Sequence, residues 1–412
     1  MTNVRSFVSS ESVHNGVVKQ GNYHKVSYFA VTNFRRHGKL FGILQEDRLF
    51  HVYVIGKTGT GKTNLLTSLA LQDVMYERGL FVFDISGDMS HTIIKYIPEH
   101  RTKDLVYLNL ADKQLRYRYN PLRYVSSDKR SLVTSSLLET FKILWKGAWG
   151  VKLEHILRYI ILTLLEFPSS TILDIQRIIV DEPFRNRVLK HIGDPTVQRF
   201  WKHEFPKFTK VDLLPILTKV GSLTAHPTVR RFLVENPDEL SLRRCMDQQQ
   251  IVVLNVSKGF VGSDVAFMVS ALLLNATMNA GFSRIDTPEQ KRSPFYLYLD
   301  EFQNYSTNTV ISMLAEIRKW KLGLVLANQY FNQLDPDIRS AVLGNVGTLI
   351  SFRVGHADAK YLAQEFHPVF VASDFVNLEN YDIYLRLMIR GKPSIPFSAS
   401  TARFTYILTL PT

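Results

Sequence analysis

Near its start the chain reads Gly56-Lys57-Thr58-Gly59-Thr60-Gly61-Lys62-Thr63, and this run matches the pattern G-x-x-x-x-G-K-[ST]. Glycines allow backbone N–H groups and the start of a following helix to surround phosphate groups closely. We therefore expect Lys62 to reach the β- and γ-phosphates of ATP, and the Thr63 hydroxyl to bind Mg²⁺. The residues expected to bind the nucleotide are Gly56, Thr58, Gly59, Thr60, Gly61, Lys62, Thr63 and Asn64. We name residues 56–63 the phosphate loop.

The residues around the phosphate loop predict an α/β fold with a mainly parallel central sheet. A short β-rich run at 51–55 precedes the loop, a helical stretch follows from Lys62 to about Arg78, and a second apolar run lies at 80–84. Strand, turn, helix and strand of these lengths form a βαβ unit, whose two strands are parallel. The same alternation returns at 251–256 and continues to about residue 353.

Between these two α/β regions the pattern becomes helical. Apolar and small residues recur at the spacing of one helix face around Ile156–Leu164, and prolines separate this stretch from similar ones. We therefore predict three parts. They are an N-terminal extension with a small β segment at 1–45, a nucleotide-binding domain made of 46–127 and 248–412, and an all-α insertion at 128–247.

A second acidic site follows an apolar strand, in the run Phe295-Tyr-Leu-Tyr-Leu-Asp300-Glu301. Asp300 is expected to hold Mg²⁺, usually through water, and Glu301 to polarise the attacking water as general base. A strand that ends in an acidic turn is common, but the phosphate loop upstream favours the catalytic interpretation. Two adjacent carboxylates at this position also argue against a simple nucleotide kinase.

Two shorter matches favour a different class of protein, a GTP-dependent regulatory switch. Asp84-Ile85-Ser86-Gly87 fits the pattern D-x-x-G, and Thr209-Lys210-Val211-Asp212 resembles the guanine-reading [NT]-K-x-D. The second match should follow an apolar strand, whereas it lies in the helical region. This alternative also leaves Asp300 and Glu301 without a role.

Charge and composition limit the possible partners. The 412 residues carry 50 Lys and Arg against 37 Asp and Glu, a net charge of +13 with histidine neutral. This excess points to a polyanion such as nucleic acid or an anionic membrane, although solvated surface lysines give the same count. A hydrophobic content of 45% excludes a disordered chain, and the single cysteine, Cys245, excludes an intrachain disulfide and a cysteine-based zinc site.

The sequence predicts no transmembrane segment and a cytoplasmic location. The first sixteen residues lack the apolar core of a signal peptide. The most apolar long stretch, 265–282, contains Ser270, Asn275, Thr277 and Asn279, which favour a buried helix over a bilayer span.

Taken together, the motifs resemble those of the HerA/FtsK-type DNA-pumping ATPases, especially the coupling-protein branch of type IV secretion systems. The resemblance extends from about Phe34 onward and rests on the order and spacing of its motifs. They are the phosphate loop, Phe83-Asp84-Ile85-Ser86-Gly87-Asp88, Asn120-Pro121-Leu122, Asp300-Glu301, Arg318-Lys319, Asn328-Gln329-Tyr330, Gly344-Asn345-Val346-Gly347 and Ser351-Phe352-Arg353.

This resemblance implies a RecA-like fold and further roles. Gln329 looks like the residue that senses the γ-phosphate, and Arg318 looks like an arginine finger that completes a neighbouring subunit's site. Arg353 is a second candidate for the finger. The family's all-α domain lies where the helical insertion was found. A homo-oligomer, a hexameric ring, and single- or double-stranded DNA are the implied partners.

Coupling proteins usually begin with transmembrane helices, which this sequence does not show. It is therefore expected to reach the inner face of the membrane through secretion-system or relaxosome proteins. A soluble HerA-like helicase or translocase in DNA processing or defence remains an alternative, and so does a DNA-binding assembly factor with a structural ATP site.

Candidate DNA contacts combine basic and aromatic residues. They are Arg116-Tyr117-Arg118-Tyr119, Arg123-Tyr124, Arg199-Phe200-Trp201-Lys202 and Arg35-Arg36-His37. Such residues pair with phosphates and stack on bases. Alternation with period two, as in the first of them, is equally typical of a half-buried strand.

Overall fold

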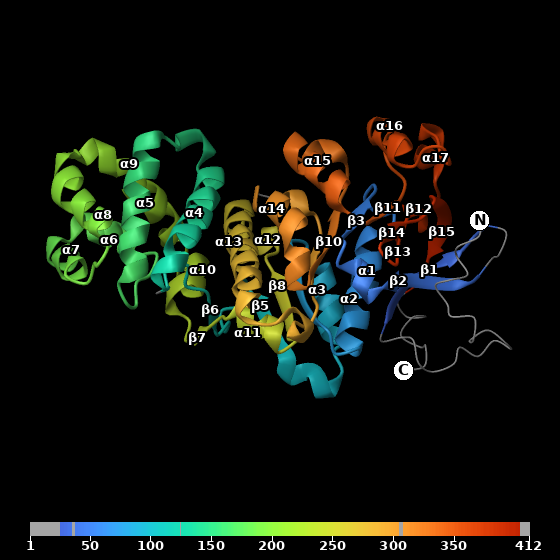
Figure 1. Ribbon diagram of the computed structural model, residues 1–412, viewed down its shortest axis with the longest axis horizontal. Coiled ribbons are helices and arrows are strands. Elements are labelled where there is room, and N and C mark those ends of the chain that lie inside the picture. Colours follow the sequence, from blue (N-terminus) through green and yellow to red (C-terminus); the bar gives the residue numbers. More distant parts are fainter. Residues whose placement is uncertain (1–24, 35–37, 124, 305–307, 404–412) are drawn as a thin grey trace. The chain divides into compact units, whose positions relative to one another are not determined.

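The computed structural model describes residues 25–34, 38–123, 125–304 and 308–403 (Figure 1). The chain divides into two compact units. Unit 1 holds residues up to Tyr107, Arg243–Asn255 and Gly281 onward, and unit 2 holds Leu108–Leu242 and Val256–Ala280. The predicted domain boundaries at 45/46, 127/128 and 247/248 stay a prediction, because the two units describe compactness and do not test where domains begin and end.

An eleven-stranded sheet runs through unit 1, and its order is β2-β1-β15-β12-β11-β3-β10-β9-β4-β8-β5. The strands are β1 (Val26–Thr32), β2 (Leu40–Leu44), β3 (Val52–Ile55), β4 (Gly79–Asp84), β5 (Leu105–Asn109), β8 (Ile251–Asn255), β9 (Phe295–Leu299), β10 (Leu322–Asn328), β11 (Thr348–Ser351), β12 (Asp382–Arg386) and β15 (Phe397–Thr401). The strands from β11 to β8 pair in parallel, as predicted. The strands from β2 to β12 pair antiparallel, so β1 and β2 extend the main sheet rather than form a separate segment.

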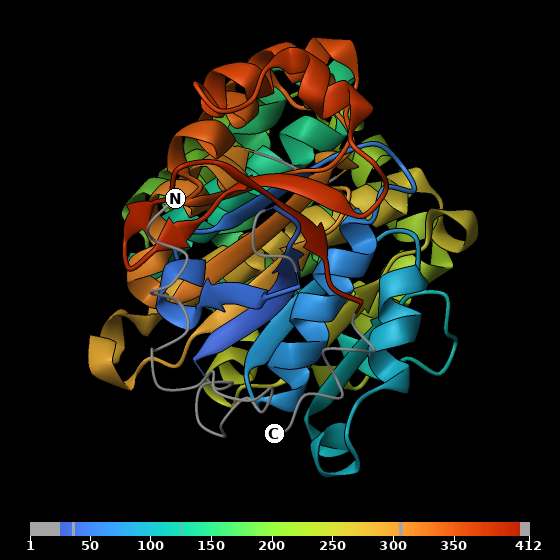
Figure 2. The same ribbon diagram turned by 90° about the vertical axis from the view of Figure 1, so that its right-hand side faces the viewer.

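Most helices of unit 1 lie between the strands of the sheet along the chain. They are α1 (Gln45–Arg48), α2 (Lys62–Met75), α3 (Asp88–Lys95), α14 (Asn308–Glu316), α15 (Pro336–Asn345), α16 (His356–Glu365) and α17 (Ala372–Asn377), with α11 (Leu242–Asp247) at the unit boundary. Figure 2 shows α2 and α3 side by side, and leucines of α2 such as Leu66 and Leu69 belong to the same buried core as Val54 and Val82 of the sheet. Because helices cover the sheet, β3 and β4 are buried along their whole length.

A buried ion network holds α1 and α2 to the sheet. The Arg48 guanidinium donates to both carboxylate oxygens of Asp73, at 2.6 and 2.8 Å, and Arg78 donates to the same carboxylate at 2.9 Å. The hydroxyl of Tyr298 on β9 also donates to Asp73. Burial raises the pKa of Asp73, but the two guanidinium groups outweigh it, and the pKa lies below its ordinary value.

Unit 2 is mainly helical, as predicted for the insertion. Its helices are α4 (Ser127–Leu144), α5 (Val151–Glu166), α6 (Asp174–Val180), α7 (Glu182–Leu189), α8 (Pro195–Arg199), α9 (Lys210–Ala225), α10 (Pro227–Arg230), α12 (Lys258–Val261) and α13 (Ser263–Phe282). Two short strands, β6 (Tyr117–Arg118) and β7 (Asp238–Glu239), pair in parallel within it. A second small ladder, β13 (Met388–Ile389) with β14 (Lys392–Pro393), belongs to unit 1.

The apolar helix predicted to be buried is α13. The segment Ser263–Asp286 is long and apolar enough to cross a membrane, but 67% of its most apolar window is buried, as in the core helix of a folded domain. Two of its polar residues have partners inside unit 2, since the Asn275 amide donates to Thr140 at 2.5 Å and Thr277 donates to the Leu273 carbonyl at 2.6 Å. Its length and composition are therefore weak evidence for a membrane span.

Candidate nucleotide-binding site

The phosphate loop connects β3 to α2, as the sequence predicted. Gly59 and Gly61 have φ values of +77° and +122°, which side chains disfavour. A Cβ at Gly56 would lie 2.5 Å from the Cβ of Phe352, so this position also needs glycine. The backbone N–H of Lys57 donates to the Arg353 carbonyl at 2.8 Å, which ties the loop to the end of β11.

Lys62 is buried within the phosphate loop. Its Nζ donates to the carbonyls of Gly56 at 2.6 Å and of Lys57 at 3.1 Å. Burial lowers the pKa of Lys62 from its ordinary value, and the nearby carboxylates of Asp300 and Glu301 partly offset this. The Lys62 ammonium therefore lies among the carbonyls of the phosphate loop, near the carboxylates of Asp300 and Glu301.

Asp300 lies against the first turn of α2. The Thr63 hydroxyl donates to Asp300 Oδ2 at 2.8 Å, which brings together the two residues predicted to hold Mg²⁺. Burial raises the pKa of Asp300 to about 6, the Thr63 hydrogen bond opposes this, and the Glu301 charge adds to it. A buried carboxylate beside a hydroxyl is a hard oxygen donor set, which fits Mg²⁺ shared with nucleotide phosphates.

No cluster of three or more His, Cys, Asp or Glu side chains suited to a metal occurs among the described residues. Mg²⁺ usually takes only one or two carboxylates from a protein and completes its shell with water and phosphate oxygens. The pair Thr63 and Asp300 matches that mode.

The Glu301 side chain is fixed by two amides. The Gln329 amide donates to Oε1 at 2.6 Å, and the Gln303 amide donates to Oε2 at 3.0 Å. Glu301 also has a left-handed backbone with φ +52°, which is uncommon for a residue other than glycine. Strained backbone conformations of this kind occur often at functional sites. The structure therefore joins Glu301 to Gln329, which follows β10.

The two candidate arginine fingers lie at opposite ends of the parallel strands, Arg318 before β10 and Arg353 after β11. Arg318 is exposed in a one-turn 3₁₀ helix (Ile317–Trp320) before β10, and its guanidinium lies 3.3 Å from the centroid of the Phe50 ring. The seven-residue strand β10 separates it from Gln329 by about 20 Å. Arg353 lies beside the phosphate loop of its own chain and donates to Asn380 at 2.9 Å. The predicted role of Arg318 thus requires a second subunit.

Sequence reasoning missed two residues of this site. Gln303 holds the Glu301 carboxylate, and Tyr381 borders the phosphate loop. The Tyr381 N–H donates to the Thr60 carbonyl at 2.9 Å, and its ring lies 3.0 Å from where a Cβ of Gly61 would be. Neither residue belongs to a motif. An open hollow of about 460 Å³ adjoins the loop and is lined by Lys57, Thr58, Gln329, Tyr330, Gly355 and Asp358.

The two short matches to GTPase motifs have structural explanations. The Asp84 carboxylate accepts hydrogen bonds from the backbone of Ser86, Gly87 and Ser90, and so closes the turn before α3. Thr209 and Asp212 form a capping box at the start of α9, in unit 2 rather than in the unit that holds the phosphate loop. The second match is therefore a helix N-terminus and not a guanine site.

Several candidate DNA contacts are already engaged. Arg116 and Arg118 pair with Asp238 and Glu239 at 3.0 and 2.9 Å across the β6–β7 ladder, so the strand interpretation of this run is correct. Phe200 and Trp201 are buried in unit 2 and cannot stack on bases. Residues 35–37 and Tyr124 lie outside the described residues, and Arg123 is exposed.

Comparisons with known proteins agree with this geometry. Residues 7–148 match the family model described as type IV secretory system conjugative DNA transfer. The plasmid coupling protein TrwB in complex with ADP and Mg²⁺ aligns with a TM-score of 0.65 and 14% identity, over 92% of this chain and 94% of that one. VirB4 of Thermoanaerobacter pseudethanolicus aligns with a TM-score of 0.63 and 13% identity, over 97% of this chain and 100% of VirB4.

No curated protein sequence matches the chain. At such low identities the two solved structures establish the fold, which is the RecA-type nucleotide-binding fold of TrwB, and the family match covers the segment that carries the phosphate loop. The family match over residues 7–148 and the shared fold both support the resemblance found in the motifs: the chain is similar to P-loop NTPases of the type IV secretion coupling type.

Proposed function

We propose that the protein is an ATP-driven DNA translocase that acts as a ring of identical subunits, a hexamer, in conjugative or type IV secretion DNA transfer. One observation carries the proposal. Hydrogen bonds link Thr63 of the phosphate loop to Asp300 and link Gln329 to the adjacent Glu301, and this supports a metal site and a general base at the same loop. This is the arrangement that nucleotide hydrolysis requires.

In this mechanism the phosphate loop binds the nucleotide through its backbone N–H groups, and Lys62 neutralises charge on the β- and γ-phosphates. Mg²⁺, when bound by Thr63 and Asp300, supplies further charge neutralisation at the phosphates. Glu301 orients a water for attack on the γ-phosphorus and accepts its proton. The amides of Gln303 and Gln329 keep the carboxylate in one orientation, so little reorganisation is needed when Glu301 accepts the proton of the attacking water.

Completion of the site by a neighbour explains why Arg318 is distant from the phosphate loop of its own chain. An exposed arginine at the far edge of the sheet reaches a nucleotide only if it belongs to an adjacent subunit of a ring. Such a group stabilises transition-state charge and couples hydrolysis to subunit contacts. Arg353 would instead act within its own site.

The proposed partners are single- or double-stranded DNA and secretion-system or relaxosome proteins. The proposed location is the cytoplasm, at the inner face of the membrane through those partners. The family match and the net charge of +13 support a polyanionic substrate.

The test measures ATPase and GTPase rates with and without DNA over a range of salt concentrations. We expect ATP turnover that DNA stimulates and that salt suppresses, because each phosphate contact releases counterions. GTP-only turnover that ignores DNA would instead support a regulatory switch. ATP binding with no turnover under any condition would support an assembly factor.

A further inference from the structure

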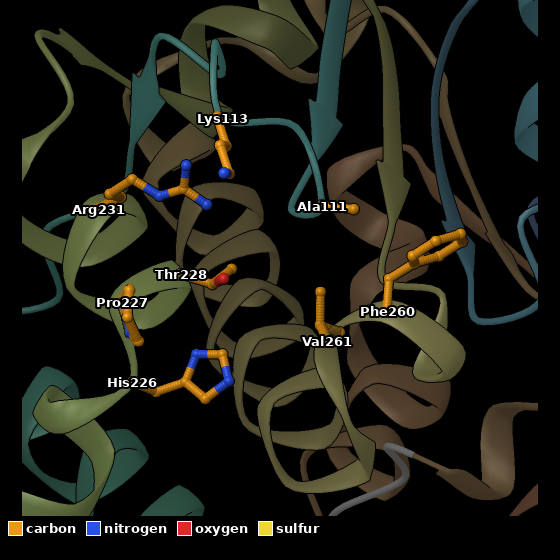
Figure 3. Close-up of a pocket in the computed structure, with 8 residues that line it drawn as sticks. All are labelled: Ala111, Lys113, His226, Pro227, Thr228, Arg231, Phe260 and Val261. Carbon is orange, nitrogen blue, oxygen red and sulfur yellow. The ribbon is translucent and has the colours of Figure 1, made fainter.

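Unit 2 contains an open hollow of about 430 Å³, which we name the unit 2 hollow. Lys113 borders it from the loop that follows β5, Thr228 and Arg231 from α10 and the turn after it, and Phe260 and Val261 from α12 (Figure 3). All of these residues belong to unit 2, so the hollow is complete within one compact unit. Nothing in the nucleotide site uses it.

The charged residues that line the unit 2 hollow are both cations. In Figure 3 the side chains of Lys113 and Arg231 extend toward the same side of the opening. Within the described part of the chain neither side chain has an ion pair or a hydrogen bond, whereas the neighbouring Arg230 pairs with Glu235 at 2.7 Å. The carboxylate of Asp112 accepts from the Gln114 backbone at 2.8 Å. Lys113 and Arg231 therefore remain available to an anionic ligand.

Phe260 adds an aromatic surface to this basic hollow. Its side chain is 81% exposed, which is unusual for a large apolar residue. The position is nevertheless well defined, because α12 is closed by hydrogen bonds from Phe260 to Ser257 at 3.0 Å and from Gly262 to Lys258 at 3.0 Å, and Val261 beside it is buried. An ordered turn thus presents the ring to solvent.

We propose that the unit 2 hollow binds single-stranded DNA, with a phosphate on Lys113 and Arg231 and an unstacked base on Phe260. Basic side chains next to an aromatic platform are the combination that single strands require, since the duplex keeps its bases stacked and out of reach. A run of acidic residues alone would use the two cations and leave the exposed ring uncovered. The inference rests on the proposed function and names the surface where the DNA is bound.

The test measures binding of a fluorescently labelled oligothymidylate to the full-length chain by anisotropy. Phe260→Ala should weaken binding by roughly 5- to 150-fold, the loss expected for one stacked base, and Phe260→Trp should preserve it. Lys113→Ala with Arg231→Ala should weaken binding and reduce the slope of log affinity against log salt by about 1.4, or about 0.7 for each cation. ATP affinity and basal ATPase should stay unchanged in all of them.

Two matched controls use exposed residues of unit 2 that do not line the hollow. Val211→Ala removes apolar surface from α9, and Lys190→Ala removes one positive charge after α7. If Phe260→Ala and the double variant bind the oligonucleotide like these controls, the inference is wrong while the proposed function stands. A wild-type chain that binds no DNA and gains no ATPase activity from it contradicts the proposed function itself. Polyglutamate binding that depends on Lys113 and Arg231, with DNA binding unaffected, would assign the hollow to an acidic protein partner.

Discussion

Glu301 is the side chain on which the proposed hydrolysis depends most. Its carboxylate accepts one hydrogen bond from Gln329 and one from Gln303, and its backbone is held in a left-handed conformation. Replacement by glutamine keeps the size of the side chain but removes the base and one of the two acceptors.

We expect Glu301→Gln to lower ATP turnover by roughly 10²- to 10⁴-fold, the usual contribution of a general base. ATP affinity should change little, because the phosphate loop and Lys62 remain intact. Single-turnover hydrolysis and equilibrium binding of a labelled ATP analogue measure the two effects separately. Turnover within a factor of two of the wild type would exclude Glu301 as the base.

His51 is expected to make the free energy of unfolding depend on pH, whether or not a nucleotide is bound. It is fully buried, its Nδ1 accepts from the Leu324 N–H at 3.1 Å, and its Nε2 lies 3.2 Å from the Leu314 carbonyl, to which it donates. Burial lowers the pKa of His51 from 6.5 to about 4, and the Leu314 carbonyl opposes this shift only in part. The folded state therefore holds the ring neutral.

Because the folded pKa lies below the unfolded one, the stabilisation is complete above pH 6.5 and is lost as pH falls toward 4. About 3 kcal/mol of unfolding free energy should disappear across this window. Urea unfolding at several pH values measures the loss. In His51→Asn, which tolerates the positive φ of +68° and does not titrate, the slope in this window should become smaller. An equal slope in both proteins would rule out His51 as its source.

At the residue scale the sequence predicted the groups that belong to motifs. Lys62, Thr63, Asp300 and Glu301 could be proposed as site residues because hydrolysis needs these residue types at fixed positions in a strand-turn-helix pattern, and their roles stay a prediction. Gln303 and Tyr381 were not, since their contributions depend on where a loop folds back and not on a local pattern.

At the scale of elements, the Asp73 network decides whether α1 and α2 stay attached to the sheet. Arg48 and Asp73 are both inaccessible to solvent, so neither can replace its partner with water. Removal of the carboxylate leaves a buried guanidinium without compensation.

We expect Asp73→Ala to lower the free energy of unfolding by about 3–5 kcal/mol, as for other buried pairs that lose one partner. Chemical denaturation followed by circular dichroism measures this value. Asp337→Ala on the exposed surface of α15 is the control and should change stability by less than about 0.5 kcal/mol. A similar small change in Asp73→Ala would show that water reaches the network.

Element boundaries were harder to predict than element types. The helix predicted to end near Arg78 ends at Met75. Thr209–Asp212 resembled a nucleotide motif because helix caps and guanine sites both favour short polar side chains. Only the location of the element in the fold separates the two.

At the scale of the whole molecule, an arginine finger supplied in trans makes activity a property of the assembly. We expect ATPase activity per subunit to rise with protein concentration, in step with the mass measured by light scattering in the presence of ATP. Arg318→Ala should reduce turnover by roughly 10³-fold or more, the lower end for an arginine finger, without weakening ATP binding to isolated subunits.

Specific activity that is independent of concentration, from a protein that stays monomeric with ATP, would contradict this. Lys319→Ala, the exposed neighbour of Arg318, is the control and should retain turnover and assembly.

The overall organisation was predictable where contacts are local. The parallel strands and the mainly helical unit follow from patterns within about thirty residues. The antiparallel side of the sheet was not predicted, because β1 pairs with β15 across more than 360 residues of chain, as in the register of Ala30 with Thr401. The segment at 1–45 was predicted as an N-terminal extension with a small β segment, and the structure pairs its described strands with the main sheet.

The chain passes from one unit to the other four times, at 107/108, 242/243, 255/256 and 280/281. No single proteolytic cut can therefore release either unit, and no contiguous gene fragment encodes the whole of unit 1. A mechanical load applied to unit 2 would be divided among four covalent links instead of being borne by one. In a protein proposed to pull on DNA, each of the four links would therefore carry less force than one linker that joined the two units alone.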